Sequence, residues 1–497
     1  MSETKKPGTF KMFYKAKIHI KVTGMKSLYT TQHRISKKKF DEFIRGVLSP
    51  AALTDLAKKV KFVQRSRKFL TPTFVAALFR SRADKEWTLS SIYRDYNALM
   101  IRQGKESMSW EPFHDFLARS QFKDFIRAIA QPISALSLEL CAGRTKELIA
   151  VLKEKLNIRD VIIQDGCVVP IENNGLRKVF KGLRGSAAKI HMSLSLLHLA
   201  PLNSVVTSGT ASETANLPLE LAFAVLFLCD AGYEDQKLFH AIDENKGFFI
   251  IKVNADCMYK VLWQCEINHD GTVSRAVEPT DDDCNPIGVS SKCNKDKCCR
   301  DIIAVTSNGQ KIRIARIYNP STQSYVNFAT NIPPEVMDIF QIAELYRARW
   351  QVERFFRCYK GFSALSGCRS GYTHIQEAMI LVSQMCADLK HIIAVMLETE
   401  SGCVISHEKM AHSGNTYIQY LIESLLLGLT GARHFYKVVM SAAESLKGSA
   451  TGYINRLKGK SLACIAAVIK RERFVSAIGY LWERVVGEWK EPIAKTP

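Results

Sequence analysis

The order of short apolar runs between residues 157 and 254 is the sequence feature that most constrains the fold. Three segments, 161–166 (VIIQDG), 189–199 (KIHMSLSLLHL) and 202–209 (LNSVVTSG), have the β-branched or alternating composition of strands. The apolar run 222–229 is followed by a helical pattern and then by another strand-like run that ends near residue 254. This order predicts an α/β layer with a mixed sheet. We expect the first strand to stop at a turn formed by Asp165 and Gly166, and the second strand to keep one face in solvent.

Different patterns flank this layer on both sides. Helical periodicity covers residues 39–130, where Thr71-Pro72 is typical of a helix start. Short strand-like pieces alternate with polar loops from about residue 256 to 330, and a helical period returns at residue 338 and lasts to the C-terminus. The sequence therefore predicts a helical N-terminal part, an α/β layer with a β-rich insertion, and a helical C-terminal part.

Positive charge is concentrated near the N-terminus. Residues 1–80 contain 19 of the 69 Lys and Arg residues but only 4 of the 48 Asp and Glu residues. A local excess of this kind is typical of a segment that meets a polyanion such as nucleic acid, although a solvated lysine-rich surface would have the same composition. The short helices of this part fit a helix-turn-helix DNA reader and an ordinary small helical bundle equally well.

The apolar runs indicate the cellular location, and the location indicates the redox state of the cysteines. The longest run, Ala222 to Cys229, is far shorter than the roughly 20 residues of a membrane span, and the first residues lack the apolar core of a signal peptide. We expect a cytoplasmic protein without a membrane partner, with its 14 cysteines reduced. The spacing of the cysteines in the insertion does not favour a structural zinc site, and free thiols are expected. These cysteines are Cys257, Cys265, Cys284, Cys293, Cys298 and Cys299.

One helical segment, 341–361 (QIAELYRARWQVERFFRCYKG), carries a polar ridge. At 100° per residue, Tyr346, Arg349, Glu353 and Lys360 fall within an arc of about 60°, and the apolar residues form a separate stripe. The ridge fits a carboxylate that binds metal beside a track of phosphates. A solvent-facing ridge of Glu, Lys and Arg would show the same pattern.

Two aspartates at strand ends strengthen the first interpretation. Asp165 lies at the end of the first strand-like run, and Asp230 directly follows the apolar run 222–229. Glu353 comes later, on the helix. Carboxylate oxygens in this order are the ligands that hard divalent cations prefer. Two such cations can activate the attacking oxygen and stabilise the leaving oxygen of a phosphodiester.

The spacing Tyr346-x2-Arg349-x3-Glu353-x6-Lys360 resembles the Y-(2)-R-(3)-E-(6)-K signature of the IS4 family of bacterial insertion-sequence transposases. The resemblance implies an RNase H-like catalytic core and a DDE triad of Asp165, Asp230 and Glu353. It also implies Mg²⁺-dependent transposition, with Mn²⁺ able to substitute, and homodimers acting on double-stranded DNA of transposon ends and target. In this interpretation Tyr346, Arg349 and Lys360 contact phosphates near the cleaved end. The protein would then act on the nucleoid in a bacterial cytoplasm.

The resemblance also gives the five regions a role. Residues 1–145 would form a basic, mainly helical DNA-binding region, and residues 146–255 the first part of the catalytic core. Residues 256–335 would form the β-rich insertion, 336–400 the second part of the core with the Glu helix, and 401–497 a helical region that helps dimerisation.

Further candidates for DNA contact come from the loop after the first aspartate and from the insertion. The basic residues of this loop could grip backbone phosphates or could simply be solvated. They are Arg177, Lys178, Lys181, Arg184 and Lys189. In some relatives a Trp of the insertion stacks on a flipped base during hairpin formation. Trp263 is the candidate here, with Tyr325 and Phe328 as rivals, so the hairpin step stays open. Two alternative functions also stay open: a metal-dependent nuclease that cuts without joining, and a catalytically silent DNA-binding protein derived from a transposase.

Overall fold

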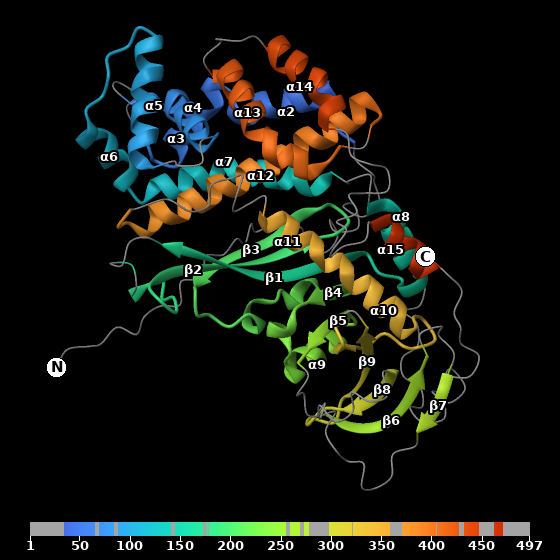
Figure 1. Cartoon of the computed structure of the whole chain (residues 1–497). Helices are drawn as coiled ribbons and strands as arrows, with labels where there is room; N and C mark the ends of the chain where they lie inside the picture. Colours follow the sequence, from blue (N-terminus) through green and yellow to red (C-terminus); the bar gives the residue numbers. More distant parts are fainter. Residues whose placement is uncertain are drawn as a thin grey trace, which may run out of the picture.

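The fold combines one large mixed sheet with a helical body (Figure 1). It was analysed in a computed structural model of the chain. The described residues are 34–64, 69–83, 88–140, 145–171, 176, 178–254, 259–268, 273–277, 298–320, 322–357, 370–403, 405–426, 432–446 and 462–470.

The described strands form a single sheet in the order β3-β2-β1-β4-β5-β10-β9-β8-β6-β7. Strands β1, β4 and β5 are parallel neighbours, and the other pairings are antiparallel. The predicted mixed sheet is thereby confirmed. The strands are β1 (Asp160–Ile171), β2 (Ser186–Ser195), β3 (Ala200–Ser208), β4 (Val225–Cys229), β5 (Phe248–Val253), β6 (Lys260–Ile267), β7 (Val273–Val277), β8 (Cys299–Val305), β9 (Lys311–Asn319) and β10 (Ser324–Thr330).

Two expectations about the first strands were wrong. β1 does not stop at Asp165 but continues to Ile171, because β2 pairs with it along this whole stretch, from Ile162 opposite Ser195 to Ile171 opposite Ser186. β2 has no wet face, and the side chains that we expected in solvent are buried. Their polar atoms pair with side chains of the neighbouring strands: Ser193 Oγ donates to Gln164 Oε1 and Ser195 Oγ donates to Asp160 Oδ2, both at 2.5 Å. Internal hydrogen bonds of this kind remove the cost of burying a polar face.

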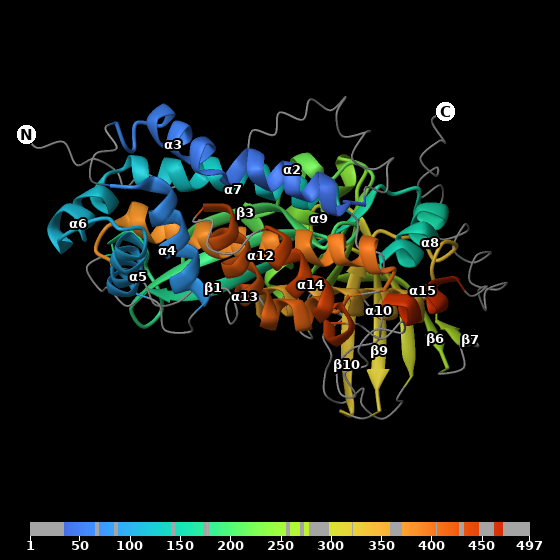
Figure 2. The same cartoon turned by 90° about the horizontal axis from the view of Figure 1, so that it is seen from above.

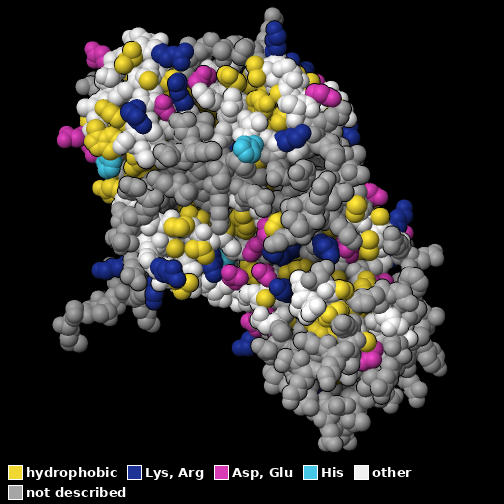
Figure 3. Space-filling view, in the orientation of Figure 1, with side chains coloured by type: hydrophobic (Ala, Val, Ile, Leu, Met, Phe, Trp, Pro, Cys, Tyr) yellow, Lys and Arg dark blue, Asp and Glu magenta, His cyan; other side chains and the backbone are white. Residues whose placement is uncertain are grey.

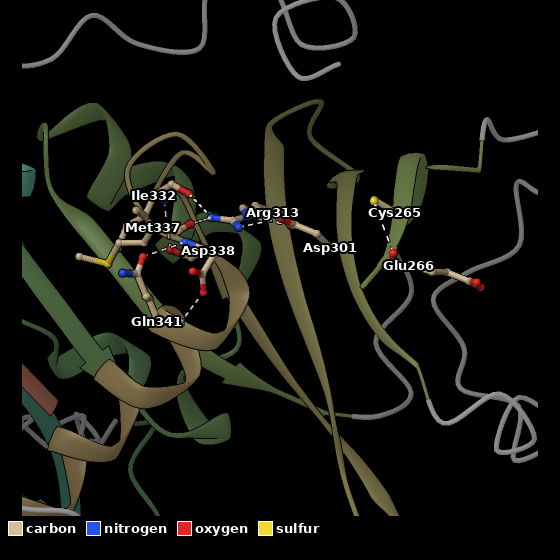
Figure 4. Close-up of polar contacts among 9 residues, drawn as sticks. Cys265, Glu266, Asp301, Arg313, Ile332, Met337, Asp338 and Gln341 are labelled. Atoms are coloured by element: carbon tan, nitrogen blue, oxygen red, sulfur yellow. Dashed lines mark hydrogen bonds and ion pairs between the residues drawn. The ribbon is translucent and has the colours of Figure 1, made fainter. Parts of the chain in front are cut away.

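The insertion is β-rich, as predicted, and it extends the same sheet. β10 pairs with β5, the last strand of the parallel group, and β9, β8, β6 and β7 follow outward. A buried ion pair holds this extension together (Figure 4). The guanidinium of Arg313 donates to both carboxylate oxygens of Asp301, at 2.8 and 2.7 Å, and to the carbonyl oxygens of Ile332 and Met337. Met337 directly precedes the N-cap of the next helix, so this arginine links two insertion strands to the segment that enters the Glu helix.

The helical body lies against β3 at one end of the sheet and contains helices from both ends of the chain (Figures 1 and 2). One hydrophobic core joins them, and α7 packs along α12 while α4 packs on α13. The helices are α2 (Lys37–Leu48), α3 (Pro50–Lys59), α4 (Thr71–Ala83), α5 (Leu89–Arg102), α6 (Trp110–Ala118), α7 (Gln121–Glu139), α12 (Thr373–Ser401), α13 (His407–Leu426) and α14 (Ala432–Leu446). The N-terminal helices are therefore part of a larger bundle, and the interpretation of some of them as a helix-turn-helix DNA reader stays a prediction.

Polar contacts inside the bundle also cross between the two ends of the chain. Lys123 Nζ lies 2.9 Å from Glu377 Oε2, and Ser134 Oγ lies 2.5 Å from Asp388 Oδ2. α12 is long and apolar enough to cross a membrane by length and composition, but its apolar window is fully buried within the chain, as in the core helix of a globular protein.

The remaining helices surround the sheet. α9 (Gln236–Glu244) connects β4 to β5, and α10 (Ile339–Tyr346), the 3₁₀ turn η8 (Arg347–Arg349) and α11 (Trp350–Arg357) follow the insertion. α8 (Lys146–Leu156) precedes β1, and α15 (Leu462–Lys470) packs on both α8 and α10. The Gln341 amide on α10 donates to the carbonyl oxygens of Val468 and Ile469. In the part that the structure describes, the C-terminal region thus contributes two helices to the bundle and one to the support of the Glu helix.

Candidate catalytic site

Parallel pairing of β1 and β4 brings Asp165, which lies in the middle of β1, next to Asp230, which directly follows β4. Gln164 pairs with Cys229, and each aspartate is the next residue of its chain. Neighbouring strands lie about 4.8 Å apart, so the two carboxyl groups are neighbours. Each carboxylate is oriented by the N–H of the next residue: Asp165 Oδ1 accepts a hydrogen bond from Gly166 N at 2.8 Å, and Asp230 Oδ1 accepts one from Ala231 N at 2.7 Å.

The helix that carries the polar ridge brings Glu353 to these aspartates. It is not one continuous α-helix: the turn η8 separates α10 from α11, with Arg349 as its last residue and Glu353 in the first turn of α11. Arg349 Nη1 lies 3.3 Å from Asp165 Oδ2, and its Nη2 donates to Glu353 Oε1. The ridge therefore faces the aspartates, and one guanidinium joins two of the three acids.

Tyr346 lies beside this arginine. Its ring centroid is 5.7 Å from the Arg349 guanidinium carbon and 4.6 Å from the ring of Phe328 on β10. Its hydroxyl is buried and has no hydrogen-bond partner among the residues that the structure describes. Burial raises the pKa of this phenol, so Tyr346 stays protonated and can donate a hydrogen bond.

Burial and neighbouring charges set the protonation of the site. Desolvation raises the pKa of Asp165 to about 6; Arg349 and the Gly166 N–H oppose this rise, while Asp230 and Glu213 add to it. For Arg349, burial works against the charged form, but the surrounding negative groups prevail and raise its pKa. These opposing shifts show a group of carboxylates that repel one another and are held together in part by a single arginine.

Glu213 belongs to this group although no sequence pattern selected it. It follows β3, and its Oε1 lies 3.1 Å from Lys189 Nζ. A Cβ on Gly166 would lie 3.0 Å from the same Oε1, and a Cβ on Gly232 would overlap Oε2. The carboxylate therefore lies against the backbone just after Asp165 and just after Asp230. Glycines close behind both aspartates were the signal available in the sequence.

The predicted phosphate-gripping residues fall into three groups. Lys178, Lys181 and Arg184 are exposed in the connection between β1 and β2, beside the exposed Leu183. Lys189 is half-buried on β2 and paired with Glu213, so in this structure it neutralises an acid of the site. Arg177 and Lys360 lie outside the described residues. Figure 3 shows acidic and basic side chains gathered side by side below the helical body.

The aromatic candidates of the insertion do not present a free ring. Trp263 on β6 is 2% exposed and belongs to the hydrophobic core, and Phe328 is 5% exposed against Tyr346. Tyr325 is half-buried under the guanidinium of Arg316, at 4.1 Å from its carbon to the ring centroid. Base stacking by any of the three would need a different local conformation.

The donor chemistry of the site fits hard divalent cations. Asp165, Asp230, Glu353 and Glu213 supply carboxylate oxygens, which Mg²⁺ and Mn²⁺ prefer. Among the described residues no three His, Cys, Asp or Glu side chains are close enough together to hold a metal ion. The position between Asp165 and Glu353 is taken by the Arg349 guanidinium, which is itself a cation. The carboxylates would hold the metal after this arginine moves.

In the insertion, Cys257, Cys284 and Cys293 lie outside the described residues. Cys265, Cys298 and Cys299 form no disulfide within the part of the chain that the structure describes, and burial raises the pKa of Cys265 to about 12.

Comparison with protein families points to one class of enzyme. Residues 157–389 match the family described as "Transposase DDE domain". The match covers a little under half of the chain and includes Asp165, Asp230 and Glu353, together with the whole insertion. The match supports the interpretation of this chain as a transposase. Enzymes of this class cleave and transfer nucleic acid and in general depend on a divalent metal.

Two further comparisons add little to this match. A search of curated proteins gave no match. A cryo-EM structure of a piggyBac transposase synaptic complex with hairpin DNA overlaps 84% of this chain and 87% of its own, at 10% sequence identity and a TM-score of 0.41. A likeness at this level carries no argument, so the case for a transposase rests on the family match and on the geometry of the site.

Proposed function

We propose that this chain is the DNA transposase of an insertion sequence similar to the IS4 family, with an RNase H-like core and Asp165, Asp230 and Glu353 as its metal-binding triad. The observation that carries the proposal is the bridge from Arg349 to Asp165, across 184 residues of sequence. Two motifs selected separately in the sequence meet in space, next to Asp230. A solvated surface ridge would have no reason to point there.

The proposed reaction is hydrolysis at the transposon 3′ ends followed by attack of the freed 3′-OH groups on target phosphodiesters. When bound, divalent cations activate the attacking oxygen and stabilise the leaving oxygen. Asp165, Asp230 and Glu353 would hold these cations. No covalent bond between protein and DNA is required.

The cationic ridge has a second part in this scheme. Arg349 neutralises Asp165 and Glu353 in this structure, and it becomes available for a DNA phosphate when these carboxylates bind cations instead. Tyr346 carries a hydroxyl without a partner among the described residues and can donate to a phosphate oxygen. A group that holds a phosphate contributes through positioning and charge stabilisation.

The partners follow from the same proposal. The chain would bind double-stranded transposon ends and target DNA as a homodimer in a bacterial cytoplasm, with Mg²⁺ as the natural ion and Mn²⁺ as a substitute. The exposed basic side chains of Lys178, Lys181 and Arg184 would contact phosphates along the DNA backbone.

One assay tests the proposal. Purified full-length protein is incubated with a labelled transposon-end duplex and a supercoiled target, with and without Mg²⁺. We expect cleaved ends and joined products only with the metal. Cleavage without joining would favour the nuclease alternative, and binding without either product would favour the silent DNA-binding protein.

A further inference from the structure

Glu213 is placed where it lies against the backbone that follows each of the two aspartates. Gly166 follows Asp165 directly, and Gly232 lies two residues after Asp230 in the 3₁₀ turn η5 (Ala231–Tyr233). The carboxylate of Glu213 fills the space that a side chain on either glycine would take. It therefore lies between the middle of β1 and the end of β4, the two places that carry the aspartates of the proposed chemistry.

The two oxygens of Glu213 have different surroundings. Oε1 is paired with Lys189, whose Nζ also donates to the carbonyl oxygen of Ala211 at 3.2 Å. Oε2 lies against Gly232 and accepts no hydrogen bond from the described residues. The side chain of Glu213 is 25% exposed and that of Lys189 is 13% exposed, so this pair is only partly screened by water.

Among the residues that the structure describes, the charges around Glu213 do not balance. Four carboxylates, those of Asp165, Asp230, Glu213 and Glu353, meet the two cationic side chains of Lys189 and Arg349. The excess negative charge favours a divalent cation, and carboxylates that orient or surround ligands raise the affinity of a metal site.

We propose that Glu213 is a positioning residue of the site, which fixes the backbone that follows Asp165 and Asp230 and raises the affinity of these aspartates for a divalent cation. This inference rests on the proposed function. The position of Glu213 also explains the glycine at position 232. The φ angle of Gly232 is not positive, so the backbone conformation alone would allow another residue there.

The glycine gives a matched variant. In Gly232→Ala the new methyl group overlaps Oε2 of Glu213, and the flexible carboxylate moves away while the backbone stays as it is. This variant should therefore have the same effect as Glu213→Ala. When Glu213 is already Ala, the added methyl group meets nothing of Glu213, so Gly232→Ala should add no further loss.

The experiment measures Mn²⁺ binding by the full-length protein without DNA, using electron paramagnetic resonance of free Mn²⁺. The variants are Glu213→Gln, Glu213→Ala, Gly232→Ala and the double variant, and Glu220→Gln is the control because Glu220 is an exposed acid of the same connection. We expect Glu213→Gln and Gly232→Ala to weaken binding about tenfold or more, the double variant to equal Glu213→Ala, and the control to bind as the parent does. In cleavage assays Glu213→Gln should need more Mg²⁺ and recover its rate when Mg²⁺ is saturating.

Two results would overturn the role of Glu213: parental Mn²⁺ affinity in Glu213→Gln, or equal losses from Gly232→Ala in both backgrounds. Asp165→Ala separates this failure from failure of the proposed function. If Asp165→Ala also binds Mn²⁺ as tightly as the parent, the proposed metal site itself is wrong. If only Asp165→Ala loses binding, the metal site stands and Glu213 is not part of its support. Thermal unfolding of each variant shows that a loss of binding is not a loss of fold.

Discussion

At the scale of single residues, the described part of the site is a balance between partly buried acids and two cations. Arg349 holds Asp165 and Glu353, and Lys189 holds Glu213. Asp165 is 18% exposed, and its ionisation is opposed by burial and by neighbouring carboxylates. Groups kept in such an unfavourable state are typical of functional sites, where binding of the natural ligand relieves the repulsion.

The metal-free protein should become more stable when the charge of Asp165 is removed. The pKa of Asp165 in the folded chain is raised from 3.8 to about 6. The stability that Asp165 contributes is thus fully present below about pH 4 and is lost as the pH rises through about 6. Asp165→Asn should raise the free energy of unfolding above about pH 6 by up to about 3 kcal/mol. Loss of the Arg349 contact makes this an upper value.

The measurement is thermal unfolding of parent and Asp165→Asn in chelator across this pH range. The stability difference should shrink as the pH falls toward about 4. A variant that is less stable than the parent at every pH would show that the bond to Arg349 outweighs the burial of the charge.

Arg349 and its neighbour Arg347 form a matched pair for testing the ridge. Arg347 is half exposed and pairs with Glu344 at 3.2 Å, away from the aspartates. Arg349→Ala should still permit initial nicking but should form the paired, doubly cleaved complex poorly, because a phosphate contact would be lost. Arg347→Ala should behave as the parent. A time course of nicked, doubly cleaved and joined DNA measures this, and parental progress of Arg349→Ala would leave the ridge without a mechanistic role. Lys360→Ala is predicted to behave like Arg349→Ala.

Sequence reasoning found the residues whose signal is local. Asp165 and Asp230 end apolar runs, and the spacing around Glu353 is a short motif. It missed Glu213, because the contact of this residue with Gly166 and Gly232 is made only when three separate connections meet. The DNA-binding role of Lys189 stays a prediction, and the sequence did not show that this lysine has a carboxylate partner.

At the scale of elements, the insertion supports the helix that carries Glu353. Helices and strands with a clear period were predicted correctly, including α4, α9, β4 and β5. Sequence periodicity did not predict that β1 continues past Asp165, because the pairing with another strand decides where a strand ends. It also did not predict the 3₁₀ turn between α10 and α11, because helix packing decides where a helix is interrupted. The insertion strands continue the core sheet through β10. Periodicity did not predict this, because it does not show which strands pair.

Breaking the Arg313–Asp301 pair should destabilise the insertion and the entry to α10. Arg313 is fully buried and Asp301 is 1% exposed, so either one alone would be an unpaired buried charge. Arg313→Leu should lower the free energy of unfolding by about 3–5 kcal/mol. Arg127→Leu is the control, since its pair with Asp124 is exposed and should contribute at most about 1 kcal/mol. Denaturant unfolding followed by tryptophan fluorescence measures both; equal effects would mean that the buried pair is not a support.

At the scale of the whole molecule, the two ends of the chain form one bundle beside the sheet. Phe40 on α2 stacks near Phe435 on α14, at 6.2 Å between ring centroids, and both are buried. A charge pattern could indicate that the N-terminal part meets DNA, but it could not show that the helices of this part share their core with the C-terminal region.

This packing decides where the basic N-terminus can be truncated. Removing residues 1–80 would remove α2, α3 and nearly all of α4 from the core, whereas residues 1–33 precede α2 and carry 7 basic residues and 1 acidic residue. Deleting residues 1–33 should keep the fold and flatten the dependence of log affinity on log salt for end DNA, by at most about 0.9 per lost phosphate contact. Anisotropy titrations over a range of salt measure the slope. An unchanged slope would mean that this charge does not contact DNA.

The central claim is that Asp165, Asp230 and Glu353 together hold the metal that cuts the transposon end. Its most direct measurement compares Asp165→Ala, Asp230→Ala and Glu353→Ala with Glu220→Ala, an exposed acid outside the site, for cleavage and for binding of the same labelled end duplex. We predict that each of the three variants loses cleavage while binding the end almost as the parent does, because these carboxylates hold metal rather than DNA. Glu220→Ala should cleave normally. Near-parental cleavage by any one of the three would remove that residue from the triad and contradict the account.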